Sequence, residues 1–181
     1  MPVAGGGFEQ CYNAQAMVMA ESLLVIAADV VQAPNDKQQI EPMLEKLAAL
    51  PEQLGQPDTL LADNGYFSEA NVAACAAANI EPLIATGRQP HHLSWQERFA
   101  AAPLAPENPT PVEAMAWRLR TPQGKQLYAL RKQTPEPVFG IIKSVMGFRQ
   151  FLLRGLERVR GEWSLVTMSW NIKRMHALSL A

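Results

Sequence analysis

Two acidic side chains stand where metal-assisted chemistry could be built, and the first of them is Asp63. It opens the run Asp63-Asn64-Gly65-Tyr66, directly after the apolar segment 59–62, which is predicted to be a strand. Ligands of open α/β sheets bind at the carboxyl ends of strands, where a carboxylate can hold a divalent cation. Asp-Asn-Gly is also a common turn sequence, and the segment alone favours a turn over a metal ligand.

The second acidic candidate, Glu136, lies at the start of a predicted helix. Thr134 suits the N-cap, and Pro135 then takes the first helical position, where its missing N–H costs nothing. Glu136 shares one face of this helix with Gly140 and Lys143. The opposite face is apolar and consists of Val138, Ile141, Ile142 and Val145. The helix dipole alone also favours a glutamate in the first turn, so a purely structural role stays open.

Charge is distributed unevenly along the chain of 181 residues, whose formal net charge is −1. Residues 1–110 hold 4 Lys or Arg against 13 Asp or Glu, a net charge of −9, whereas residues 111–181 hold 12 against 4, a net charge of +8. A basic half suggests a polyanion as partner, nucleic acid among them. The alternative is a set of solvated helix faces, which the charge count alone does not exclude.

The elements that must position these side chains begin with a predicted hairpin. Residues 12–19 and 22–31 are rich in Ala, Val, Leu and Ile, and the turn is expected near Ala20-Glu21. Leu23-Leu24-Val25-Ile26 is predicted to be a buried strand. Asn35 or Asp36 is then expected to cap a helix that ends before Pro51.

A strand, a helix and another strand follow, over residues 59–62, 68–78 and 81–86, with Ser68 as the helix N-cap. This alternation predicts parallel strands joined by a crossover helix. Residues 88–114 are rich in Pro and Gly and predict an insertion or long loop, with a short helix near 95–101 and with His91 and His92 as loop residues.

Residues 115–120 and 126–130 are predicted to be short strands around the turn sequence Thr121-Pro122-Gln123-Gly124. Two helices are expected to finish the chain. The last carries an apolar stripe that favours core packing and consists of Trp163, Val166 and Trp170. We expect no membrane span or signal peptide, and we interpret Cys11 and Cys75 as small buried hydrophobes.

The sequence resembles the catalytic domain of insertion-sequence DDE transposases. Tyr128-x-x-Arg131, Glu136 and Lys143 resemble the signature around the last acidic residue, although that signature usually has three residues between Arg and Glu, whereas four follow Arg131 and three follow Lys132. Further matching segments cover nearly the whole chain in order: Tyr12-Asn13-Ala14-Gln15, Gln32-Ala33-Pro34-Asn35-Asp36, Leu61-Ala62-Asp63-Asn64-Gly65-Tyr66, Ile84-Ala85-Thr86-Gly87-Arg88, Phe139-Gly140-Ile141-Ile142-Lys143, Gly147-Phe148-Arg149, Arg154-Gly155-Leu156-Glu157 and Asn171-Ile172-Lys173-Arg174.

The resemblance implies an α/β fold, an RNase H-like mixed sheet flanked by helices, with 1–181 as one partial catalytic domain. In that family three carboxylates hold two Mg²⁺ or Mn²⁺ ions for phosphodiester chemistry. Asp63 and Glu136 match two of them. The first aspartate would precede Tyr12, so we expect a C-terminal fragment that is truncated at the first strand. We do not assign Asp29 as the missing first metal ligand.

The resemblance also implies DNA as the partner. Residues expected to contact DNA, mostly its phosphates, are Arg131, Lys132, Lys143, Arg149, Arg154 and Tyr66, and Arg158 and Arg160 extend the basic region. Tyr66 could equally pack into the core. We expect a bacterial protein of the cytoplasm and nucleoid that binds DNA without cutting it. Two alternatives remain: a non-catalytic partner that self-associates or pairs with full-length transposase and interferes with it, and an unrelated α/β binding domain.

Overall fold

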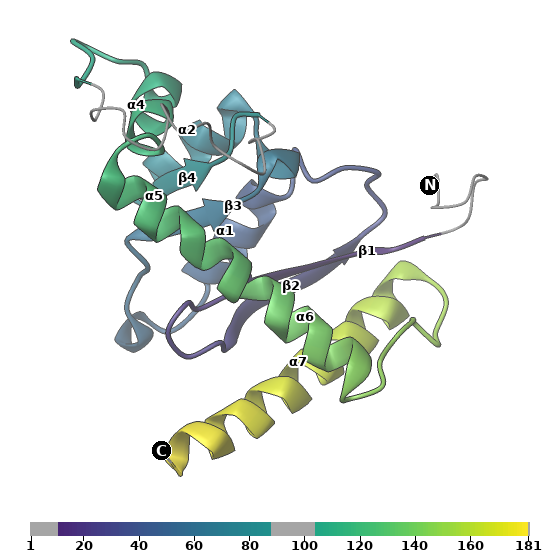
Figure 1. Ribbon diagram of the computed structural model, residues 1–181. Helices are drawn as coiled ribbons and strands as arrows, with labels where there is room; N and C mark the ends of the chain where they lie inside the picture. The colour runs from purple at the N-terminus through teal and green to yellow at the C-terminus, as the bar shows by residue number, and fades with distance from the viewer. Residues whose placement is uncertain (1–10, 88–103, 181) are drawn as a thin grey trace. The chain divides into compact units, whose positions relative to one another are not determined.

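The computed structural model describes residues 11–87 and 104–180, and these form two compact units (Figure 1). The first unit takes its described residues from Met1–Asp36, Glu45–Ala49 and Lys132–Ala181, and the second from Lys37–Leu44 and Leu50–Arg131. Both helices and strands occur, and the α/β class expected from the sequence is confirmed. The predicted helix near 95–101 and the two adjacent histidines lie outside the described residues.

The predicted hairpin is present in the first unit. Strands β1 (Asn13–Val18) and β2 (Val25–Val31) pair antiparallel, with Asn13 opposite Val31. The turn is closed by the N–H of Met19, which donates to the carbonyl of Leu24 at 2.9 Å. Leu23 adopts a φ of 59°, a left-handed conformation, so β2 begins at Val25 and not at residue 23 as predicted.

Helices α6 (Pro135–Ser144) and α7 (Leu156–Ser179) complete the core of this unit. Both tryptophans of the predicted stripe are buried on α7, and the indole N–H of each donates a hydrogen bond to a backbone carbonyl. The indole N–H of Trp163 donates to the Gln15 carbonyl at 3.0 Å, and that of Trp170 donates to the Leu23 carbonyl at 2.8 Å. The predicted core role of the stripe is therefore confirmed. The buried members of the core are Val25, Val30, Val138, Ile142, Val159, Trp163 and Trp170.

The predicted cap of the next helix is wrong. Helix α1 spans Ile40–Ala48, several residues after Asn35 and Asp36, and its residues are divided between the two units. The Asp36 carboxylate instead accepts hydrogen bonds from the side-chain amides of Asn13 and Gln15, each at 2.7 Å. The Asp36 carboxylate therefore makes a tertiary contact to β1 in place of a helix cap.

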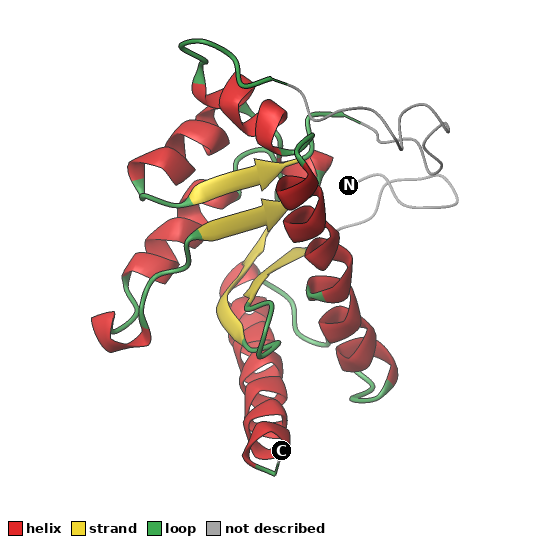
Figure 2. Cartoon of the chain, turned by 60° about the vertical axis from the view of Figure 1, so that its left-hand side comes forward, coloured by secondary structure: helices red, strands yellow, loops and turns green. Residues whose placement is uncertain are grey.

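The second unit contains the predicted strand, helix and strand. Strands β3 (Thr59–Ala62) and β4 (Glu81–Ile84) are parallel, as the alternation predicts, and helix α2 (Glu69–Ala77) connects them (Figure 2). The predicted N-cap is also correct, because the Ser68 hydroxyl accepts from the Asn71 N–H at 3.1 Å. Cys75 on α2 is fully buried, whereas Cys11 is half-buried.

The strands predicted over 115–120 and 126–130 are wrong, because both segments are helical. Helix α4 (Pro111–Arg118) begins with a capping box in which Thr110 and Glu113 satisfy each other's backbone N–H groups. These hydrogen bonds from Thr110 also lower the pKa of Glu113. Helix α5 (Pro122–Ala129) is capped by the Thr121 hydroxyl. The supposed turn residue Gly124 lies against α4, where an added Cβ would clash with the Arg118 carbonyl oxygen.

Three short 3-10 helices complete the description: η1 (Glu52–Leu54), η2 (Asn64–Tyr66) and η3 (Leu130–Gln133). In the part of the chain that the structure describes, strand pairing gives two two-stranded sheets, β1 with β2 and β3 with β4. Within the described ranges, no helix has the length and apolar character needed to cross a membrane.

Candidate active site

Asp63 lies at the carboxyl end of the parallel strand β3, as the sequence predicts. One carboxylate oxygen, Oδ1, accepts a hydrogen bond from the Gly65 N–H at 2.8 Å, which caps η2. The side chain nevertheless keeps 52% of its exposure. The turn interpretation and the ligand interpretation are therefore compatible, because one oxygen holds the turn while the carboxylate stays accessible.

Tyr128 on α5 forms a hydrogen bond to the end of β3, directly before Asp63. Its hydroxyl donates to the carbonyl of Ala62, the residue before Asp63, at 3.2 Å. The pKa of Tyr128 is raised, first by burial and then by the negative charge of Asp63, against the opposing effect of Arg131. The sequence placed this tyrosine in the transposase-like signature without giving it a role, and no sequence signal pointed to its bond with β3.

Arg131 forms an ion pair with Asp63. Its Nη1 lies 3.9 Å from Asp63 Oδ2, and the guanidinium carbon stands 5.6 Å from the centre of the Tyr128 ring. Only 20% of the Arg131 side chain is exposed. Tyrosine and arginine thus belong to one cluster with Asp63, in which the arginine partly neutralises the carboxylate.

Glu136 lies in the first turn of α6, at the position expected, and its side chain is exposed. Pro135 takes the first helical position, but the Thr134 side chain makes no capping hydrogen bond. Lys143 is exposed on the same helix. The apolar face is buried at Val138 and Ile142, whereas Val145, predicted to belong to it, is 64% exposed because the helix ends there.

The two predicted acidic ligands belong to different units. Asp63 is part of the second unit and Glu136 is part of the first. Each fits a metal site as a single accessible carboxylate. Within residues 11–87 and 104–180, no group of three or more His, Cys, Asp or Glu side chains is arranged to hold a metal ion. Arg131 close to Asp63 also disfavours a second cation there.

The residues expected to contact DNA differ in their surroundings. Lys132, Lys143, Arg149 and Arg154 are exposed, as phosphate contacts require, and so is Arg158. Arg131 is mostly buried beside Asp63. Tyr66 is half-buried in η2, and its carbonyl accepts from the Asn71 side chain at 2.6 Å.

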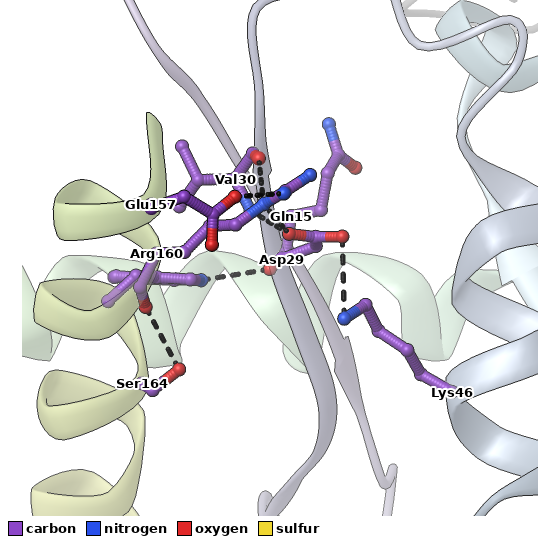
Figure 3. A network of polar contacts seen from close by, with 8 residues as sticks. Gln15, Asp29, Val30, Lys46, Glu157, Arg160 and Ser164 are labelled. Atoms are coloured by element: carbon purple, nitrogen blue, oxygen red, sulfur yellow. Dashed lines mark hydrogen bonds and ion pairs between the residues drawn. The ribbon is translucent and has the colours of Figure 1, made fainter. Parts of the chain in front are cut away.

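Arg160 belongs to an ion-pair network with Asp29 on β2 (Figure 3). Its Nε donates to Asp29 Oδ1 at 2.9 Å, and Lys46 lies 3.4 Å from the other oxygen. Asp29 keeps only 11% of its side-chain exposure. The Val30 N–H also donates to Asp29, at 2.7 Å. Both oxygens of the Asp29 carboxylate are engaged by these partners, which indicates a structural role. This agrees with the decision not to predict Asp29 as a metal ligand.

Comparison with known proteins gives one family. No curated protein and no solved structure matches the chain. The family model described as the transposase DDE domain matches residues 3–172, which is nearly the whole chain and includes Asp63, Arg131 and Glu136. The α/β fold, the accessible Asp63 at the end of β3 and the signature around Glu136 agree with this match. The chain therefore belongs to the family of transposase DDE domains.

Proposed function

We propose that Asp63 and Glu136 are two of the three acidic residues of a DDE site, and that the complete site cuts and joins DNA at insertion-sequence ends. We further propose that this chain of 181 residues by itself binds DNA without cutting it. The observation that carries the proposal is the family match over residues 3–172, which includes both carboxylates. The exposed position of Asp63 at a strand end supports its role as a ligand.

The chemistry explains why three carboxylates are expected. In two-metal phosphodiester chemistry the cations, Mg²⁺ or Mn²⁺, activate the attacking hydroxyl and stabilise the leaving oxygen. Two divalent cations held close together repel each other and need several anionic ligands to offset that repulsion. Asp63 and Glu136 alone leave such a site short of negative charge. The role proposed for both residues is therefore to hold metal in a site that the described residues do not complete.

We assign the basic side chains two roles. Lys132, Lys143, Arg149 and Arg154 are exposed and contact the DNA phosphates. Arg131, mostly buried beside Asp63, balances the charge of that carboxylate while no metal is bound, and its proposed further role is a contact with a DNA phosphate. Tyr66 ends the turn that Asp63 caps, three residues after that carboxylate, and is half-buried there, with a contact to the DNA end as its further role.

DNA binding is tested by charge reversal. Lys143→Glu should weaken binding to duplex DNA of any sequence, whereas Lys37→Glu, an equally exposed lysine on the acidic half, should change it little. Lys46 is unsuitable as a control because it pairs with Asp29. Affinity should fall steeply as salt rises. Binding that is flat between low and moderate salt, or equal losses in both variants, contradicts the proposal.

The absence of cleavage is tested directly. The purified chain is incubated with Mg²⁺ or Mn²⁺ and a duplex that carries insertion-sequence ends, and no cleavage or strand transfer is expected. Cleavage that disappears in both Asp63→Ala and Glu136→Ala would show that the site is complete without a third ligand from elsewhere. Asp29 and Asp36 would then be candidates for the missing ligand, although both are engaged in contacts within the first unit.

A second candidate function is interference with an intact transposase. The chain carries the basic C-terminal half, so it could occupy DNA or pair with the active enzyme without contributing chemistry. Adding it to an intact transposase of the same family should then lower the cleavage rate. Inhibition that disappears with excess non-specific DNA points to competition for DNA, and inhibition that persists points to protein pairing.

A further inference from the structure

The turn that begins at Asp63 is contacted from helix α2 by a buried amide. Asn71, the third residue of α2, keeps only 2% of its exposure. Its side-chain Nδ2 donates to the Tyr66 carbonyl at 2.6 Å. Tyr66 is the last residue of η2, the short helical turn whose N-cap is Asp63. One side chain of α2 therefore holds the end of the same turn that Asp63 caps at its start.

Helix α2 itself does not need an amide at this position. The Ser68 hydroxyl caps α2 by accepting from the backbone N–H of Asn71 at 3.1 Å, so the cap uses no atom of the Asn71 side chain. Asparagine is a poor helix former, and a buried amide costs free energy unless it is hydrogen-bonded. The other buried residues of α2, Val72 and Cys75, are apolar. The amide of Asn71 thus serves the turn that lies outside the helix.

The turn determines how the Asp63 carboxylate is presented. Oδ1 accepts from the Gly65 N–H at 2.8 Å, so Oδ2 is the oxygen left for a cation. The backbone N–H groups of Tyr66 and Phe67 close the turn with hydrogen bonds of 3.2 Å each, at the long end of the ordinary range. The bond from Asn71 to Tyr66, at 2.6 Å, is the shorter contact. We therefore expect the amide to hold Gly65 in place beneath Asp63.

We propose that Asn71 is a positioning residue for metal binding, which holds η2 so that Asp63 presents Oδ2 to a divalent cation. The residue before Asp63 is held separately, because the Tyr128 hydroxyl donates to the Ala62 carbonyl at 3.2 Å. Asp63 thus lies between a strand end held from α5 and a turn held from α2. The inference rests on the role of Asp63 as a metal ligand proposed above. Residues that orient a metal ligand commonly contribute about ten- to a hundredfold to the affinity for the metal.

The proposal is tested by Mn²⁺ titration of the full chain, followed by the broadening of the Gly65 amide signal. Asn71→Leu and Asn71→Ala should each raise the dissociation constant for Mn²⁺ about tenfold. Leucine fills the space of the amide and alanine empties it, so a loss that both variants share comes from the missing donor and not from packing. Val72→Ala is the matched control, because it removes buried apolar contacts from the same helix and should leave the Mn²⁺ affinity of the folded chain unchanged.

Hydrogen exchange gives a second readout that needs no metal. In both Asn71 variants the Gly65 N–H should exchange with solvent faster than in the parent and in Val72→Ala, because η2 opens more often. An unchanged exchange rate or Mn²⁺ affinity in the Asn71 variants, or an equal loss of affinity in Val72→Ala, overturns the proposal. Mn²⁺ binding that depends on Asp63 but not on Asn71 overturns this inference alone. A parent chain that binds no Mn²⁺ near Gly65 contradicts the proposed role of Asp63 as well.

Discussion

Asp29 lies on β2 and Asp63 directly after β3, one in each unit, and the surroundings of the two carboxylates are opposite. Asp29 keeps 11% of its side-chain exposure and contacts Arg160, Lys46 and the backbone N–H of Val30. Asp63 keeps 52% and has one backbone donor and one guanidinium at 3.9 Å. The first carboxylate is filled by protein groups, whereas the second retains room for a ligand.

The difference separates a structural carboxylate from a functional one by what surrounds it and not by residue type. A carboxylate whose oxygens are occupied inside the fold must lose those partners before it can bind a metal, and that loss destabilises the protein. A half-exposed carboxylate at a strand end can exchange water for metal at little cost to the fold. The comparison predicts different responses when each is changed.

The largest effect is expected at Asp29. Asp29→Asn removes the charge that faces Arg160 and Lys46 and should lower the free energy of unfolding by about 3 kcal/mol. This value is at the low end for a broken buried ion pair because both cations are partly exposed. Asp63→Asn should change it by less than about 0.5 kcal/mol, since asparagine caps the turn as well as aspartate does. Urea denaturation measures both, and equal losses would break the comparison.

A smaller effect should come from Cys75, in the core of the unit that carries Asp63. Burial raises the pKa of its thiol from 9.0 to about 11. As the pH rises, the thiol of the unfolded chain ionises before that of the folded chain. The contribution of Cys75 to the free energy of unfolding is therefore fully present below pH 9 and decreases by about 2 kcal/mol as the pH rises toward 11. The unfolding free energy of Cys75→Ala, measured alongside the parent at each pH, should lack this decrease. Parallel curves would show that the thiol ionises freely and that this core is open.

The smallest effect concerns Tyr128. Tyr128→Phe removes the hydroxyl that donates to the Ala62 carbonyl and should cost about 1 kcal/mol at neutral pH. In the parent chain the raised pKa of Tyr128 should appear in an ultraviolet titration as a signal, absent from Tyr128→Phe, that ionises above the ordinary range of tyrosine. A variant as stable as the parent would show that the end of β3 is held by other contacts.

Local patterns in the sequence predicted several elements correctly, because neighbouring residues determine them. Ser68 followed by an acidic first turn identified α2, and the apolar runs around residues 20–21 identified the hairpin. The prediction of a turn between strands at Thr121-Pro122 is wrong, although the same Thr-Pro pattern at Thr134-Pro135 correctly predicts a helix start. Glu113, three residues after Thr110, carried the capping-box signal that predicts α4.

Long-range contacts could not be predicted from the sequence. Asp36 was expected to cap a helix, but it accepts from two amides on β1 more than twenty positions away. Asp63 and Glu136 were found through their motifs, whereas the bond from Tyr128 to β3 crosses 66 positions and has no local pattern. Arg131 is expected to contact DNA because it lies near Glu136 in the transposase-like signature, and only the fold shows that Asp63 lies beside it.

Mn²⁺ binding followed by NMR tests most directly the claim that Asp63, and not Asp29, is a metal ligand. Paramagnetic Mn²⁺ broadens amide signals near its binding site. The account predicts that substoichiometric Mn²⁺ broadens the amides of Gly65 and its neighbours while leaving Val30 sharp, and that Asp63→Asn abolishes the effect. Broadening centred on Val30, or broadening at Gly65 that survives Asp63→Asn, would contradict it.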